Sequence, residues 1–171
     1  DPGLGRRNGE AVLREVAKVS RNADVFIAST HFHAEHTTGA GALPPTAKYV
    51  NSRVQEAEFA QNGAQQIQAF SGRSPMTAQL LEGATGRKAD IVFDRNYTLD
   101  LGGVRVRFRV VGPTHTAGDT GIFVEGDGVL FAGDVVMNNS FLAAGQASSV
   151  KAWLAAFDAF DAMRPTTIVP S

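Results

Sequence analysis

The feature that most constrains the fold is a strict alternation of apolar and charged residues over positions 104–110. Valine and phenylalanine occupy every second position of this segment, and Arg105, Arg107 and Arg109 lie between them. A period of two is the repeat of a β-strand, whereas a helix repeats every 3.6 residues. The segment therefore predicts a half-exposed strand, and its arginine face is more typical of a solvated surface than of an anion-binding site.

Other apolar runs extend this β-rich region along the second half of the chain. Residues 122–124 and 129–131 flank Gly126-Asp127-Gly128, which is a strong hairpin signal. We interpret residues 91–99 as one strand and residues 166–169 as the last strand. In the first half, short strands are expected over residues 25–29 and 48–51.

Apolar residues at helical spacing predict helices between these strands. In the first half they are expected over residues 9–20, 52–70 and 74–81. A further helix is expected over residues 148–163, where Val150, Leu154, Phe157 and Phe160 fall on nearly one face. Alternation of helices and strands without a linker or repeat predicts one α/β domain over residues 1–171, which we expect to be incomplete at both ends.

Composition narrows the classes of partner. The chain is 43% apolar and 19% charged with a formal net charge of −1, which describes an ordinary folded protein and gives no electrostatic reason to expect nucleic acid or an anionic membrane. No apolar run approaches the roughly 20 residues that cross a bilayer. We therefore expect a small-molecule substrate. Because the chain has no cysteine, any metal ion must be held by imidazole and carboxylate groups.

Three of the four histidines lie within six residues, in the sequence HFHAEH that directly follows the strand expected at 25–29. In an extended backbone His31 and His33 project to the same side, so that one metal ion can bind both imidazoles. His36 is out of phase with this pair. If the chain turns into a helix after His33, Glu35 and His36 can reach a second ion beside the first.

The fourth histidine and one aspartate complete the candidate ligand set. His115 follows the alternating strand and can form a set of three imidazoles with His31 and His33, which leaves a fourth position open for water, as in catalytic zinc sites. Asp134 follows the strand expected at 129–131, and its two oxygens could bridge both ions. Such ligands suit zinc and also iron or manganese.

The series HFHAEH, GPTHTAGDTG and VLFAGDVV resembles the motifs of the metallo-β-lactamase superfamily, in the same order and over nearly the whole chain. The resemblance implies an αββα sandwich, in which two mixed sheets are flanked by helices. It assigns His31, His33 and His115 to the first zinc ion, Glu35 and His36 to the second, and Asp134 to both. Asp1 matches, more weakly, an aspartate that the family places near the site.

Two departures from the family pattern concern the second ion. The family usually has aspartate where this chain has Glu35, and the added methylene lengthens the side chain by on the order of 1.5 Å, against a tolerance of about 0.2 Å in ligand distances. Either the loop adjusts, or the second ion shifts or binds weakly. The family also supplies one more histidine after a late strand, but this sequence ends at Ser171 before such a residue. We therefore expect an incomplete second site.

The resemblance implies a zinc-dependent hydrolase in which a metal-bound hydroxide attacks an ester, thioester, lactone or related bond. Glu35 and Asp134 are the expected catalytic residues, because a carboxylate can orient the hydroxide and carry its proton. A β-lactam hydrolase is an alternative, although Met137 stands where one β-lactamase group has lysine. Two further alternatives are an iron-dependent oxidoreductase of the same fold and a non-catalytic binding protein.

Overall fold

The computed structural model describes residues 1–22 and 24–171, which pack into two compact units. The first unit comprises Asp1–Asn51 and Glu56–Val92, and the second comprises Ser52–Gln55 and Phe93–Ser171. Together they form a mixed α/β fold that contains two β-sheets with flanking helices, which confirms the expected fold class. The expectation of a single domain over residues 1–171 stays a prediction.

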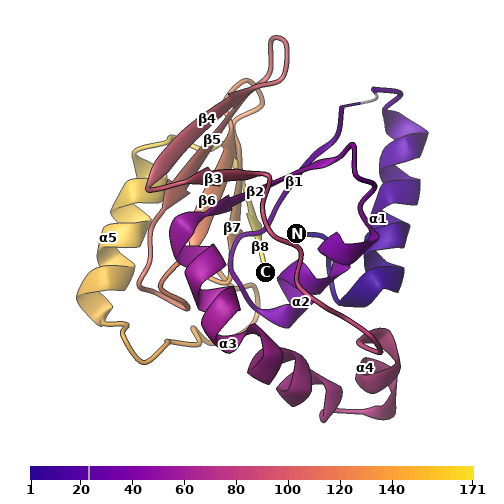
Figure 1. The fold of residues 1–171 in the computed structure, drawn as a ribbon. Coiled ribbons are helices and arrows are strands. Elements are labelled where there is room, and N and C mark those ends of the chain that lie inside the picture. The colour runs from indigo at the N-terminus through magenta and orange to yellow at the C-terminus, as the bar shows by residue number, and fades with distance from the viewer. Residues whose placement is uncertain (23) are drawn as a thin grey trace. The chain divides into compact units, whose positions relative to one another are not determined.

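The first unit carries a three-stranded sheet and most of the helices (Figure 1). Its elements are α1 (Gly5–Val19), β1 (Phe26–Ala28), α2 (Ala34–Thr37), the 3-10 helix η1 (Thr38–Ala42), α4 (Pro75–Leu80) and most of β2 (Lys48–Ser52), α3 (Arg53–Ser71) and β3 (Ile91–Phe93). The strand order is β1-β2-β3, and β1 runs parallel to β2, with Ile27 opposite Tyr49. The histidine-rich segment thus follows the first strand of this sheet.

The helix α1 begins one turn earlier than the sequence pattern predicts, at Gly5 instead of Gly9. Both glycines are buried, and a Cβ atom at Gly9 would clash with the carbonyl oxygen of Gly39. The start of α1 therefore packs through bare backbone, with Gly5 against Leu80 of α4 and Gly9 against Gly39 of η1. Hydrophobic periodicity does not reveal such a turn, because it contributes no large apolar side chain.

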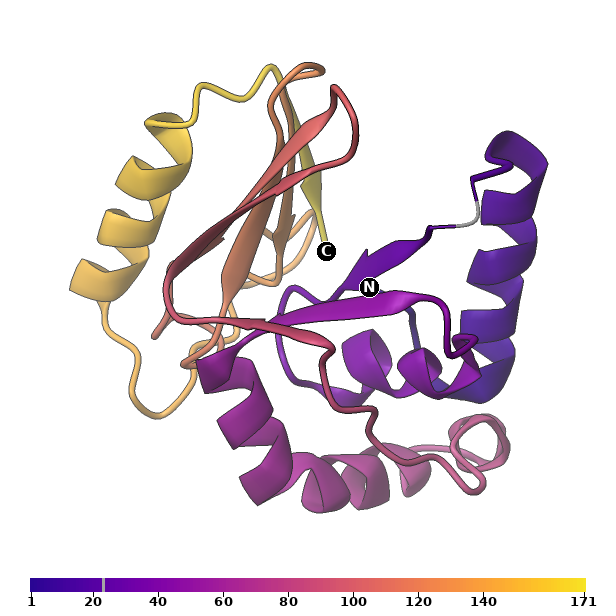
Figure 2. The same cartoon turned by 45° about the horizontal axis from the view of Figure 1, so that its top comes forward.

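The second unit carries a five-stranded mixed sheet and one helix (Figure 2). Its elements are β4 (Asn96–Asp100), β5 (Arg105–Val110), β6 (Thr120–Val124), β7 (Val129–Gly133), α5 (Val150–Asp161) and β8 (Thr167–Pro170). Neighbouring strands from β4 to β7 are antiparallel, and β8 runs parallel to β7. The predicted hairpin at residues 122–131 and the predicted last strand are both present.

The predicted alternation along β5 is confirmed. Val106, Phe108 and Val110 are buried, whereas Arg105 is exposed and Arg107 is half-buried. Arg105 and Arg107 each form an ion pair with Glu125, at 3.3 and 3.0 Å respectively. Both arginines are thus paired with a carboxylate of the protein, which agrees with a solvated strand face and not with an anion-binding site.

The prediction of one strand over residues 91–99 is wrong. The chain bends at Asp94 and Arg95, so that β3 belongs to the first sheet and β4 to the second. The carbonyl of Arg95 accepts a hydrogen bond from the N–H of Val110, 2.9 Å away, which fixes the bend on the second sheet. Apolar periodicity is similar on both sides of the bend, because it reports burial and not which strand is the pairing partner.

The predicted apolar face of α5 is also partly wrong. Val150 and Leu154 are 78% and 58% exposed, whereas Trp153 and Phe160 are buried. The buried face packs with Phe123, Leu130 and Ala132 of the second sheet, and Ala156 lets the helix approach closely.

None of the helices in the described part of the chain has the length and hydropathy that a membrane-spanning helix needs.

Candidate metal centre

The histidine-rich segment of the first unit changes from strand to helix within five residues. The strand β1 ends at Ala28, and His33 is the extended N-cap residue of α2, with φ −60° and ψ 153°. The chain therefore turns into a helix directly after His33, as the expectation for Glu35 and His36 requires. His31 is fully buried, which fixes its ring within the unit.

Two imidazole nitrogens of this segment have the spacing of ligands on one ion. His31 Nε2 lies 3.1 Å from His33 Nδ1. Two nitrogen ligands on a tetrahedral zinc ion are about 3.3 Å apart, because zinc–nitrogen bonds are about 2.0–2.1 Å long. The ring planes are inclined at 76°, so the rings do not stack. This pair fits a shared metal ion in both donor type and spacing.

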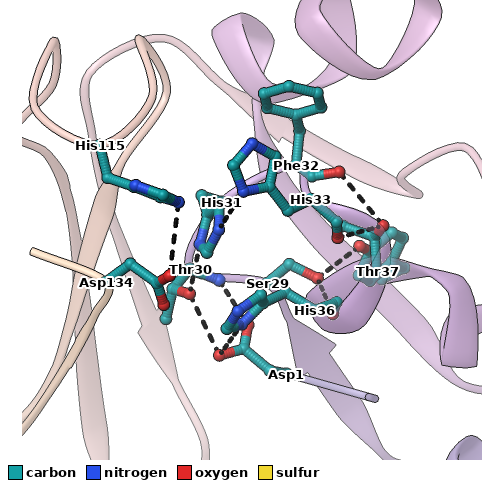
Figure 3. A network of polar contacts seen from close by, with 11 residues as sticks. Asp1, Ser29, Thr30, His31, Phe32, His33, His36, Thr37, His115 and Asp134 are labelled. Carbon is teal, nitrogen blue, oxygen red and sulfur yellow. Dashed lines mark hydrogen bonds and ion pairs between the residues drawn. The ribbon is translucent and has the colours of Figure 1, made fainter. Parts of the chain in front are cut away.

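The ring of His31 is oriented by a short chain of hydrogen bonds (Figure 3). The hydroxyl of Thr30 donates to Asp1 Oδ2 at 3.1 Å, and the N–H of Thr30 donates to Asp1 Oδ1 at 2.6 Å. Because the hydroxyl has only one proton, Thr30 Oγ1 accepts from His31 Nδ1, which is 3.2 Å away. The proton of a neutral His31 therefore lies on Nδ1, and Nε2 carries the lone pair that a metal ion needs.

His36 lies on α2 beside the same aspartate. His36 Nδ1 is 3.2 Å from Asp1 Oδ2, and the His36 ring centroid is 4.1 Å from that of His31. A carboxylate at Nδ1 favours the tautomer with its lone pair on Nε2. Glu35 lies in the first turn of α2 and is half-buried. Its assignment as a ligand stays a prediction.

In the second unit, His115 lies on a loop that is held by one buried carboxylate. Asp119 accepts hydrogen bonds from the Thr114 hydroxyl, from the Thr116 N–H at 2.8 Å and from the Thr116 hydroxyl at 2.6 Å. Burial raises the pKa of Asp119, while these hydrogen bonds act in the opposite direction. Both neighbours of His115 are thus fixed by the same side chain, as expected for residues that flank a ligand.

The ring of His115 is oriented from two sides. His115 Nδ1 lies 2.6 Å from the carbonyl oxygen of Ala143, which can only accept, so Nδ1 is the protonated nitrogen. His115 Nε2 lies 3.3 Å from Asp134 Oδ2, and Asp134 directly follows β7 (Figure 3). Both side chains are largely buried. Sequence reasoning missed Ala143, because a backbone carbonyl leaves no signal in residue type.

The structure therefore joins His31, His33 and His36 within the first unit, and His115 and Asp134 within the second. Each imidazole for which a tautomer is assigned has its proton on Nδ1, held by an oxygen atom. Histidines that bind a metal ion commonly donate their other ring N–H to an oxygen atom in this way. Imidazole and carboxylate donors of this kind could hold a metal ion.

Comparison with known proteins gives the family. The family model of the metallo-beta-lactamase superfamily matches residues 1–171, and the chain belongs to this superfamily. No curated protein matches the chain. A solved metallo-beta-lactamase from Pontibacter korlensis is 20% identical with a TM-score of 0.74, and the match covers 99% of this chain and 71% of that one.

A second solved structure extends the comparison to another activity. The stereoselective inverting sec-alkylsulfatase Pisa1 from Pseudomonas sp. is 17% identical, with a TM-score of 0.70. That match covers 99% of this chain and 32% of the sulfatase chain. At such identities the two likenesses establish a shared fold, and the reaction has to be argued from the residues.

Proposed function

We propose that the protein is a zinc-dependent hydrolase whose centre is completed by the donor sets of both units. His31, His33 and His115 would hold the first ion, Glu35 and His36 would hold the second, and Asp134 would contact both. The observation that carries this proposal is the 3.1 Å spacing of His31 Nε2 and His33 Nδ1. Membership of the superfamily over residues 1–171 supports joining the two sets, because all the motifs belong to one family pattern.

Neither donor set alone completes the proposed first ion. Catalytic zinc sites use three protein ligands and keep one position open. The first unit offers the His31–His33 pair to the first ion, and because His36 is assigned to the second ion, His115 is the imidazole that remains. Its tautomer leaves Nε2 as the donor nitrogen, as in His31. A third ligand from the second unit would therefore complete the first ion.

Zinc bound by these residues would supply Lewis acidity, which polarises a substrate oxygen and makes water more acidic. The protein's own contribution is orientation and proton transfer. Asp1 and Thr30 fix the tautomer of His31, and the Ala143 carbonyl fixes that of His115. Asp134 and Glu35 are the carboxylates that would accept the proton of the attacking water.

Hydrolysis of an ester, thioester, lactone or related bond is the reaction class we favour. The structures compared above are named a metallo-beta-lactamase and a sec-alkylsulfatase, which supports hydrolysis without selecting a substrate. β-Lactams are the second candidate, because several similar structures carry that name. Met137 leaves no cation at the position where one β-lactamase group has lysine, so we expect weak activity on them.

Metal analysis combined with substrate panels tests this proposal. The zinc-loaded protein is expected to bind at least one ion per chain and to hydrolyse at least one aryl ester, thioester, lactone, sulfate ester or chromogenic β-lactam. Asp134→Asn should abolish most activity, while Asp127→Asn should leave it unchanged, because Asp127 lies in the exposed hairpin turn.

Less than one ion per chain, or equal rates for the parent and His115→Ala, would contradict the proposal. Metal-specific anomalous scattering from the loaded protein distinguishes zinc from iron. Iron in the native protein together with redox-dependent spectra would favour the oxidoreductase alternative.

A further inference from the structure

A buried chain of hydroxyl groups leads from the first sheet to His36. The phenolic oxygen of Tyr49 on β2 lies 2.6 Å from Ser29 Oγ, and Ser29 Oγ lies 3.0 Å from the carbonyl oxygen of His36 (Figure 3 shows the second contact). Tyr49 and Ser29 are only 1% and 2% exposed. Neither residue belongs to a motif of the sequence, and neither is among the proposed ligands.

The direction of these hydrogen bonds follows from the number of protons. The carbonyl of His36 can only accept, so the single hydroxyl proton of Ser29 is used in that bond. Ser29 Oγ must then accept from the Tyr49 hydroxyl. Burial raises the pKa of Tyr49 to about 12, so the phenol keeps its proton at neutral pH. The Tyr49 hydroxyl therefore donates to Ser29 Oγ, and the Ser29 hydroxyl donates to the carbonyl of His36.

The tyrosine end of this chain is rigid. The N–H of Tyr49 donates to Asp90 Oδ2 at 2.8 Å, and the N–H of Asp90 donates to the Tyr49 carbonyl at 2.8 Å. Asp90 is also paired with Arg87, at 3.1 Å. The Tyr49 side chain lies in the core of the first unit with Ala40 and Leu43. Its hydroxyl is thus a fixed point on the sheet.

The histidine end, in contrast, belongs to a very short helix. The helix α2 has four residues, Ala34–Thr37, and a helix of that length has little stability of its own. The orientation of His36 therefore depends on what holds α2 in place. The hydrogen bond from Ser29, which directly follows β1, to the backbone carbonyl of His36 limits rotation of that residue.

We propose that Tyr49 and Ser29 are positioning residues that hold the backbone of His36 so that its imidazole can bind the second ion. This inference rests on the proposed function, because it assumes that His36 is a metal ligand. Neither residue touches the ion or the substrate. Their effect should be confined to the His36 ion, since the His31 ring is oriented separately by Thr30 and Asp1.

Site-resolved zinc titration tests the proposal. The parent, Tyr49→Phe and Ser29→Ala are titrated with zinc against a chelator, and His36→Ala identifies which binding step belongs to the His36 ion. Loss of an outer-shell partner typically weakens metal binding about 10- to 100-fold. We expect a loss in that range for the His36 ion and unchanged affinity for the other ion. Tyr97→Phe, on β4, is the control and should bind both ions like the parent.

The double variant, which combines Tyr49→Phe and Ser29→Ala, tests whether Tyr49 acts on His36 through Ser29 or independently of it. Because Tyr49 acts through Ser29, the loss in the double variant should equal that of Ser29→Ala alone. Additive losses, equal weakening of both ions, or parent-like binding by Tyr49→Phe would overturn the proposal. If Tyr49→Phe does not fold, Ser29→Ala alone is the test: it should weaken binding of the His36 ion and leave the affinity for the other ion unchanged. A parent protein that binds no zinc would overturn the proposed function and this inference together, whereas normal binding by both variants would overturn only this inference.

Discussion

Burial raises the pKa of two individual residues, Tyr49 and Asp119. Tyr49 and Asp119 are both buried, and in each case desolvation is the largest cause of a raised pKa. A raised pKa means that the folded state holds the proton more tightly than the unfolded state. Stability from such a group is complete below its unfolded pKa and is lost as pH rises through its folded pKa. Both residues therefore make pH-dependent predictions with a defined sign.

For Tyr49, the predicted loss of stability lies in the alkaline range. The phenol ionises near its ordinary pKa of 10.0 in the unfolded chain and at about 12 in the folded protein. We expect the parent to lose up to about 2.7 kcal/mol of unfolding free energy between pH 10 and 12 that Tyr49→Phe does not lose. Urea unfolding of both proteins across this range measures the difference. Parallel pH profiles would show that the phenol is not buried as described.

For Asp119, we predict that substitution by alanine loosens the His115 loop. Three donors from Thr114 and Thr116 lose their acceptor, which should lower the unfolding free energy by about 2–4 kcal/mol. Because the pKa of Asp119 is raised, the difference between parent and Asp119→Ala should be larger at pH 4 than at pH 7. Urea unfolding at both pH values tests this, with Asp127→Ala as the exposed control. A difference that grows with pH would contradict the assigned shift.

At the scale of secondary-structure elements, the sequence predicts which segments are helices and strands better than it predicts their partners. The alternation of β5 and the hairpin of β6 and β7 are local patterns, and the structure confirms them. The break between β3 and β4 depends on hydrogen bonds to residues far along the chain. The start of α1 depends on glycines that approach a distant backbone. Local periodicity contains neither kind of information.

The helix α5 gives a quantitative test of its corrected face. Phe160 is 3% exposed and packs on the second sheet, whereas Leu154 is 58% exposed. Phe160→Ala should therefore lower the unfolding free energy by about 3–5 kcal/mol. Leu154→Ala should change it by no more than about 0.5 kcal/mol, as an exposed substitution. Equal losses in urea unfolding would show that the helix presents the face predicted from sequence.

For the molecule as a whole, the sequence can point to a candidate site because the proposed ligands are rare residue types in a family order. All four histidines and Asp134 are predicted in that way, and their role as ligands stays a proposal. The groups that orient them are not predicted, because they are backbone carbonyls such as that of Ala143, or ordinary core residues such as Tyr49 and Ser29. Their roles depend on distances and directions, which residue types do not encode.

Metal-linked stability tests whether the two donor sets form one centre. A ligand that binds only the folded state stabilises it, by about 2.7 kcal/mol when its concentration is 100 times its dissociation constant. Zinc should therefore raise the melting temperature of the parent, and a chelator should reverse the increase. His33 and His115 are proposed ligands of the same first ion, so His33→Ala in the first unit and His115→Ala in the second should each remove the same part of this increase, and the double variant should remove no more. Asp127→Asn should keep the full increase. If each donor set binds zinc alone, the losses of the two single variants would add in the double variant, and the proposed shared centre would be wrong.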